Sequence, residues 1–182
     1  MGLKNTTIEY GTLAKALHWL VAIALFALIF LGLEQEGMES GDERSRIRFI
    51  HASIAAITFM LMTIRIVWRF MNEVPAKPDG TPSWQGMISS IVHWGLYITV
   101  FVQIFAGAMV VGTGGKGVPV FGLFTIPVPV TENHDAHEWW EEVHEFAWKP
   151  LAALIIVHIL GALYNHVIIK NDVVRRMTVG VK

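Results

Sequence analysis

The sequence of 182 residues contains no cysteine. This absence excludes disulfides, iron–sulfur clusters, thiolate zinc sites and the covalent attachment of c-type haem. Charged residues are also scarce, at 16%, and the net charge of −1 gives no indication of nucleic-acid binding. Any haem in this protein therefore has to be non-covalent and held by side chains such as histidine or methionine.

Long apolar stretches, by contrast, are abundant. Apolar residues make up 53% of the chain and the mean hydropathy is +0.49, which is typical of a membrane protein. Four stretches reach the length of about 20 residues that a spanning helix needs. They cover residues 13–33, 47–71, 87–112 and 146–169. We therefore expect an all-α membrane protein, with one domain over residues 1–182 that forms a four-transmembrane-helix bundle.

The basic residues are distributed unevenly between the two ends of this bundle. Nine of the fourteen Lys and Arg residues, Lys182 included, lie at the end that holds both termini, whereas eleven of the fifteen acids lie at the other end. The positive-inside rule then places both termini in the cytoplasm. The outer loop over residues 113–145 is too long for a plain connector, and we expect its proline-rich part, Val118–Val130, to form an ordered cap over the outer end.

Two histidines, His144 and His158, lie fourteen residues apart in the last apolar stretch. At 3.6 residues per turn they share one helix face, roughly 21 Å apart along the axis. In the expected topology His51 lies at the outer depth of His144, and His18 at the inner depth of His158. Imidazole within a membrane is costly and usually has a partner or a function. Four histidines paired by depth predict the axial ligands of two haems.

The inner pair has an alternative. His93 opens the third stretch beside Trp94, much as His18 opens the first beside Trp19, so His18 could pair with His93. The fourteen-residue spacing favours His158, because it shares a face with His144. Two histidine ligands fill both axial positions of a haem iron, which suits electron transfer better than O₂ binding.

Several further residues could contact a quinone or the haem propionates: His93, Lys15, Arg44 and Arg48. Anchoring to lipid headgroups explains most of them almost as well. A second cluster could hold a metal ion instead, although it lacks the His-Glu-x-x-His spacing of a zinc site. It comprises His134, His137, Glu138, Glu141 and His144.

Short motifs along nearly the whole chain carry a family resemblance. They are Tyr10-Gly11, Ala16-Leu17-His18-Trp19-Leu20, His51, Arg65 with Trp68-Arg69, Val120-Phe121-Gly122, His144-Glu145, His158, and the tail from Lys170-Asn171-Asp172 to Arg175-Arg176-Met177. With them the sequence resembles the bacterial cytochrome b561 family. The resemblance implies a multi-pass protein of the bacterial inner membrane with two b haems, ligated by His18 and His158 at the inner site and by His51 and His144 at the outer site.

The resemblance also implies a function, because one characterised member is similar to a superoxide oxidase that passes electrons from periplasmic superoxide to ubiquinone. We expect a diheme b-type cytochrome that moves single electrons between a periplasmic species, for which superoxide is one candidate, and the quinone pool.

The outer face is acidic, with eleven acids against five bases, whereas a surface that gathers an anion should be basic. Two alternatives therefore stay open: a cytochrome b subunit of a periplasmic dehydrogenase or hydrogenase complex, and a non-redox transporter or interaction module.

Overall fold

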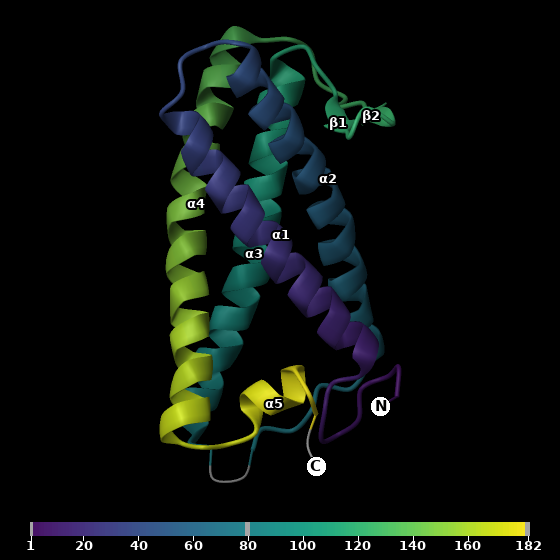
Figure 1. Cartoon of the computed structure of the whole chain (residues 1–182), viewed down its shortest axis with the longest axis vertical. Helices are drawn as coiled ribbons and strands as arrows, with labels where there is room; N and C mark the ends of the chain where they lie inside the picture. The colour runs from purple at the N-terminus through teal and green to yellow at the C-terminus, as the bar shows by residue number, and fades with distance from the viewer. Residues whose placement is uncertain (1, 79–80, 181–182) are drawn as a thin grey trace.

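Four long helices dominate the computed structural model, which describes residues 2–78 and 81–180 (Figure 1). Each of these helices is long and apolar enough to cross a membrane, the fourth together with the turn that follows it, up to Ile168. The expected spans fall on these helices, so the prediction of a four-helix membrane protein is confirmed. The helices are α1 (Thr12–Glu36), α2 (Asp42–Met71), α3 (Ser83–Thr113) and α4 (His134–Leu163).

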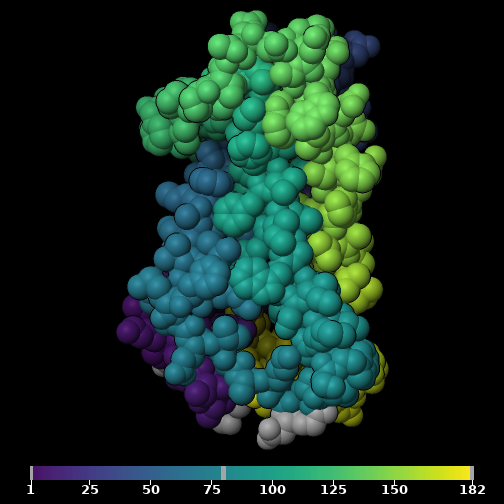
Figure 2. Space-filling model, turned by 180° about the vertical axis from the view of Figure 1, so that it is seen from behind, coloured from purple at the N-terminus to yellow at the C-terminus, as the bar shows by residue number. Residues whose placement is uncertain are grey.

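The helices form two antiparallel hairpins. The first hairpin packs α1 along α2, the second packs α3 along α4, and the two hairpins meet mainly along α2 and α3. Both ends of the described chain lie at the same end of the bundle (Figure 1), while α2, α3 and α4 lie side by side on the opposite face (Figure 2). We call the end with the termini the inner end, and the other the outer end. Lys182, one of the nine basic residues assigned to the inner end, lies outside the described residues.

The hydrophobic core lies between the two ends, where all four helices contribute. Its buried members are Val21, Met62, Tyr97, Val100 and Leu151. Leu151 is seven residues from both His144 and His158, so apolar side chains fill the middle of the bundle and leave polar groups to the two ends. This distribution suits a membrane protein, because unpaired polar groups are costly away from water.

Helix α4 begins with a polar cap and ends irregularly. The side chain of Asn133 accepts a hydrogen bond from Ala136 N at 2.8 Å, which satisfies one of the free amides at the helix start. The helix continues through Pro150 and passes into a π-helical turn, η1 (Tyr164–Ile168). A short helix follows at the inner end, α5 (Val173–Met177).

The outer loop contains a small β-hairpin, formed by β1 (Val118–Val120) and β2 (Phe124–Ile126). Val118 pairs with Ile126 and Val120 pairs with Phe124 in antiparallel register. The hairpin lies against the side of α2 (Figure 1), rather than over the outer end as the proline-rich sequence led us to expect. The reason is the burial of Val120, together with a hydrogen bond of 3.0 Å from Phe121 N to Ser53 Oγ on α2.

The N-terminal segment folds back on the start of α1. Asn5 Oδ1 accepts a hydrogen bond from Gly11 N at 2.9 Å, and Asn5 Nδ2 donates to Glu73 O at 2.8 Å beyond the end of α2. A Cβ atom at Gly11 would collide with the backbone of Leu3 and Lys4. Glycine at this position is therefore required by the close approach of two backbone segments.

We expect Gly11→Ala to destabilise the protein by about 2 kcal/mol, because the new methyl group cannot be accommodated unless the N-terminal segment leaves α1. Thermal unfolding of the detergent-solubilised protein measures the effect, and faster proteolysis of the segment locates it. Gly37→Ala is the matched control, since nothing lies within 4 Å of a Cβ at Gly37. Equal melting temperatures for the two variants would contradict the prediction.

Candidate functional site: two histidine pairs between the helical hairpins

At the inner end, His18 on α1 faces His158 on α4. Their ring centroids are 6.1 Å apart and the ring planes cross at 65°. Nη2 of Arg65 lies 3.2 Å from Nδ1 of His18, and Nη1 of the same side chain donates to Ala14 O at 3.2 Å. A guanidinium can only donate hydrogen bonds. Nδ1 of His18 is therefore the acceptor, and the proton of this ring is on Nε2.

At the outer end, His51 on α2 faces His144 on α4, with ring centroids 6.3 Å apart and ring planes at 75°. Gln103 on α3 holds His144 at both nitrogens: the backbone oxygen is 3.0 Å from Nδ1, and the side-chain Nε2 is 3.1 Å from the imidazole Nε2. Because a carbonyl oxygen only accepts, Nδ1 carries the proton. The lone pair on Nε2 accepts the bond from the amide.

His51 is held differently from its partner. Its ring is hydrogen-bonded to the backbone of Leu28. Its Nδ1 is buried and has no hydrogen-bond partner within the part of the chain that the structure describes. A buried polar atom left unpaired costs about 1–3 kcal/mol, so it calls for an explanation such as a metal or another ligand.

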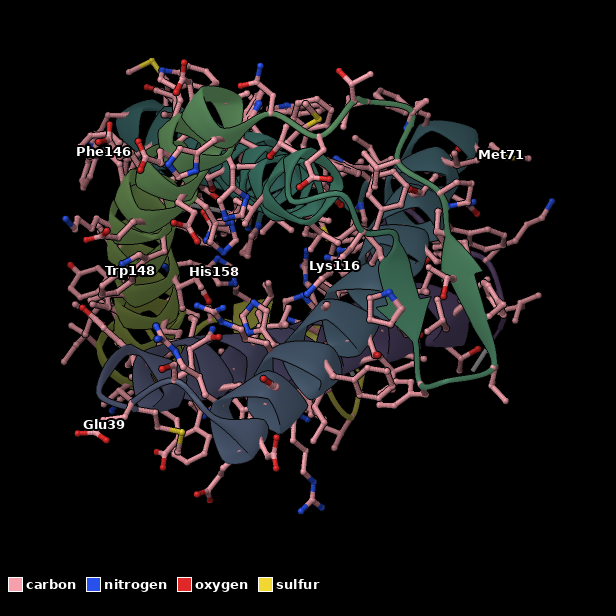
Figure 3. The ribbon with its side chains drawn as sticks, turned by 90° about the horizontal axis from the view of Figure 1, so that it is seen from above. Glu39, Met71, Lys116, Phe146, Trp148 and His158 are labelled. Carbon is pink, nitrogen blue, oxygen red and sulfur yellow. The ribbon has the colours of Figure 1, made fainter. Side chains whose placement is uncertain are left out.

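Both pairs join one helical hairpin to the other. Seen from the outer end, His158 lies on the side of α4 that faces the centre of the bundle (Figure 3). The two α4 histidines are fourteen residues apart, which corresponds to roughly 21 Å along the helix. The structure thus brings together all four of the expected ligand residues, as two pairs at two depths.

The separation within each pair fits a metal ion held between two imidazoles. With metal–nitrogen bonds of about 2.0–2.1 Å, and ring centres about 1 Å further out, opposite ligands place their ring centres about 6 Å apart. The observed values of 6.1 and 6.3 Å match this geometry. The alternative inner pair was His18 with His93, but the ring next to His93 is that of His158, at 5.2 Å, and this contact lies between α3 and α4 within one hairpin.

Two glycines lie against the outer histidine pair. A Cβ atom at Gly32 would lie 3.7 Å from Cε1 of His51, and one at Gly107 would lie 2.9 Å from Cε1 of His144. Gly107 therefore gives the His144 ring the space that it occupies. The sequence alone did not single out Gly32, Gly107 or Gln103.

The other predicted contact residues are scattered. His93 adjoins His158, as described. Lys15 is buried at 7% exposure and lies 3.7 Å from Glu9, so Glu9 offsets its charge. Arg44 is half-buried, and its Nε has no hydrogen-bond partner in the described ranges, whereas Arg48 is exposed on α2. Of these four residues, His93 is the one that contacts a paired histidine within the described part of the chain.

A basic and aromatic cluster that the sequence analysis did not single out lies beside the inner pair. The guanidinium of Arg69 is 5.6 Å from the ring centre of Trp94 and 5.9 Å from that of Tyr97, within the range of cation–π contacts. Arg65, Arg69, Tyr10 and Tyr97 all line one small cavity of about 20 Å³. Burial raises the pKa of the Tyr10 phenol, although the nearby arginines oppose this shift. The inner end thus concentrates positive charge next to His18.

The alternative metal cluster in the outer loop does not assemble. His134 pairs with Glu138 at 3.3 Å and His137 pairs with Glu141 at 3.4 Å, each within one turn of α4. Nδ1 of His137 also donates to Val110 O at 2.9 Å. Among the residues that the structure describes, no three His, Asp or Glu side chains are placed to share a metal ion.

The chain is similar to known membrane cytochromes. A family profile described as prokaryotic cytochrome b561 matches residues 9–180. Cytochrome b561 homolog 2 of Escherichia coli strain K12 is 26% identical over 178 residues, which is 97% of this chain and 95% of the relative. The probable superoxide oxidase CybB of Yersinia pestis is 24% identical over 170 residues, covering 93% of this chain and 95% of that protein.

The family match extends over nearly the whole chain, and the four long apolar helices are those of a multi-pass membrane protein. A b-type haem is the cofactor that this family implies, and the cysteine-free sequence is compatible with non-covalent haem. The chain belongs to the prokaryotic cytochrome b561 family and is a membrane b-type cytochrome.

Proposed function

We propose that the protein binds two b haems and transfers single electrons between the outer side of the bacterial inner membrane and the quinone pool. His18 and His158 hold the inner haem, and His51 and His144 hold the outer haem. The observation that carries the proposal is the pair of ring separations, 6.1 and 6.3 Å, each between histidines of different helical hairpins. By the positive-inside rule both termini are cytoplasmic.

Bound haem supplies one-electron oxidation and reduction, and the axial ligands help to set its potential. The chain supplies the orientation of those ligands. At the outer site the backbone oxygen of Gln103 fixes the proton of His144 on Nδ1, which leaves the Nε2 lone pair for iron. The amide of Gln103 donates to that lone pair in this structure, so it would have to turn away for Nε2 to hold the iron.

Haem binding at the inner site would require a larger change in hydrogen bonding than at the outer site. His18 accepts a hydrogen bond from Arg65 at Nδ1, so its proton is on Nε2. If Nε2 were to hold the iron, the proton would have to be on Nδ1, and the contact with Arg65 would be lost because a guanidinium cannot accept a hydrogen bond. The released guanidinium, with Arg69 nearby, can balance the negative charge of haem propionates. His93 is the side chain best placed to contact a quinone at this end.

Superoxide is the proposed electron donor. One relative with 24% identity is named a probable superoxide oxidase, and it matches 93% of this chain. The overall reaction balances as two superoxide anions giving two O₂ while one quinone takes up two electrons and two protons. Although the outer face has a net negative charge, Lys116 lies near the centre of the bundle when seen from the outer end (Figure 3). Local positive charge from Lys116, Arg44 and Arg48 would attract the anion there.

The acidic outer loops support a second candidate, a cytochrome b subunit that docks to a periplasmic dehydrogenase or hydrogenase. In that case the outer acids would form the contact surface for a basic partner. Stopped-flow spectroscopy of the purified protein separates the two candidates. We expect superoxide to reduce the haem rapidly, added ubiquinone to reoxidise it, and superoxide dismutase to abolish the reduction. No reduction by superoxide, combined with stable co-purification of a soluble catalytic subunit, would favour the second candidate.

Ligand substitution tests the two-haem assignment. The wild-type protein should contain two haems per chain with reducible b-type Soret and α bands. We expect His158→Ala to lose one of them and keep the other, because His51 and His144 are untouched. His93→Ala should retain both haems and serves as the matched control at the inner end. Loss of a haem from His93→Ala would contradict the inner pair, and absence of both bands in the wild type would contradict haem binding altogether.

Gly107→Ala tests the support of the outer pair. The added methyl group would stand 2.9 Å from Cε1 of His144 and displace the ring from the position in which Gln103 holds it. We expect about tenfold weaker haem binding at the outer site, as is common when the orientation of a metal ligand is disturbed. Haem titration into the haem-depleted protein measures this change. Gly161→Ala, where nothing lies within 4 Å of the added Cβ, should leave both affinities unchanged.

A further inference from the structure

The β1–β2 hairpin exposes a continuous apolar surface. The segment Val118–Val130 contains no charged residue, although it interrupts an otherwise acidic outer loop. Leu123 at the turn is 82% exposed, Phe124 is 59% exposed and Phe121 is 46% exposed. Every residue of strand β2 is exposed. Such a patch on a water-soluble surface indicates a site of interaction or a risk of aggregation.

The hairpin lies at the depth of a membrane-spanning helix rather than beyond its end. Its turn is bonded to α2 through Phe121 N and Ser53 Oγ at 3.0 Å. Ser53 is two residues from His51 and eleven residues from the start of α2 at Asp42, so the contact is about 16 Å below the outer end of the helix. Figure 1 shows the hairpin beside the upper part of α2, outside the bundle.

The strand geometry excludes deep burial in lipid and favours the interface. Strand β2 pairs with β1 on one side only, so its other edge carries unpaired backbone groups. Such an edge is not tolerated in the hydrocarbon core. At the boundary of headgroups and acyl chains, however, water and headgroups can satisfy the backbone while apolar side chains enter the lipid. An exposed apolar edge strand in water would instead invite pairing between copies of the chain.

We propose that the β1–β2 hairpin is inserted into the outer leaflet, and that its partner is phospholipid. The side chains of Phe121, Leu123 and Phe124 enter the outer ends of the acyl chains, and the free edge of β2 lies among the headgroups. The hairpin then covers the α2 side of the outer histidine pair, so a water-soluble electron donor approaches from the outer end of the bundle.

The absence of native cysteine allows a direct test with single nitroxide spin labels. Leu123→Cys reports on the hairpin turn, and two variants are matched controls: Ile23→Cys, 65% exposed in the middle of α1, and Glu39→Cys in the exposed loop between α1 and α2. The labelled, haem-loaded proteins are reconstituted in phospholipid vesicles. Power saturation then compares collisions with O₂, which concentrates in lipid, against collisions with a water-soluble nickel chelate.

We expect the label at position 123 to collide more with O₂ than with the nickel chelate, as the label at position 23 does, and the label at position 39 to show the reverse. If the ratio of O₂ collisions to nickel-chelate collisions at position 123 equals the ratio at position 39, the proposal of lipid insertion is wrong. Spin–spin broadening at position 123 that disappears on dilution with unlabelled protein would also overturn it, because the hairpin would then contact a second copy. Unchanged haem content in Leu123→Cys shows that the fold is intact.

Discussion

The cost of placing an imidazole inside a membrane is the constraint on which the rest of this structure depends. Each ring has two polar nitrogens, and neither can be left to lipid without loss of stability. The chain meets part of this cost with hydrogen bonds, from Arg65 to His18 and between Gln103 and His144. It also places the four histidines as two pairs across the helical hairpins, His18 with His158 and His51 with His144. The hairpins otherwise meet mainly along α2 and α3, so the pairs bridge sides of the bundle where direct helix packing is weak. The apolar core around Leu151 then separates the two polar levels. Helix packing, small residues and the position of each pair follow from this single requirement.

Much of this arrangement was predictable from the sequence, for reasons that concern particular residues. The four spans follow from length and hydropathy, and the fourteen-residue spacing of His144 and His158 follows from helix geometry alone. The role of Gln103 was harder to predict, although an amide within the apolar third span itself indicates that a polar partner lies nearby. Its two contacts with His144 depend on how α3 and α4 pack, which the sequence does not state.

The position of the β-hairpin was mispredicted because prolines in Val118–Val130 exclude a helix but do not say where the chain lies. The bond from Phe121 N to Ser53 decides that, and it joins residues 68 apart.

The two ends of the bundle differ in charge, and this difference bears on function more than the fold does. Arg65 and Arg69 lie beside the inner pair, and Arg69 stacks on aromatic rings of α3. The outer end carries most of the acids and few bases. A positive inner end favours anionic groups such as propionates there, whereas the outer end can attract an anion only where its few bases gather. The four-helix fold does not by itself specify an electron donor, so the charge of the outer loops bears on that question more directly.

The hydrogen bonds of His18 and His144 imply that the two proposed sites would need different rearrangements to bind a haem. At the outer site, the Gln103 backbone oxygen already holds His144 in the tautomer that offers Nε2 to a metal, and His51 has an unpartnered nitrogen. On the proposed assignment, haem binding there would exchange the neutral amide bond from Gln103 for an iron bond. At the inner site, Arg65 stabilises the opposite tautomer of His18, and a charged donor has to be released. Hydrogen bonds to charged groups contribute about 1.5–3 kcal/mol, more than neutral ones, so the inner exchange costs more unless the guanidinium finds a new anion. The propionates of a bound haem would supply such an anion. On the proposed assignment, the inner site would thus be completed by its cofactor, whereas the chain already holds His144 at the outer site in the tautomer that ligation needs.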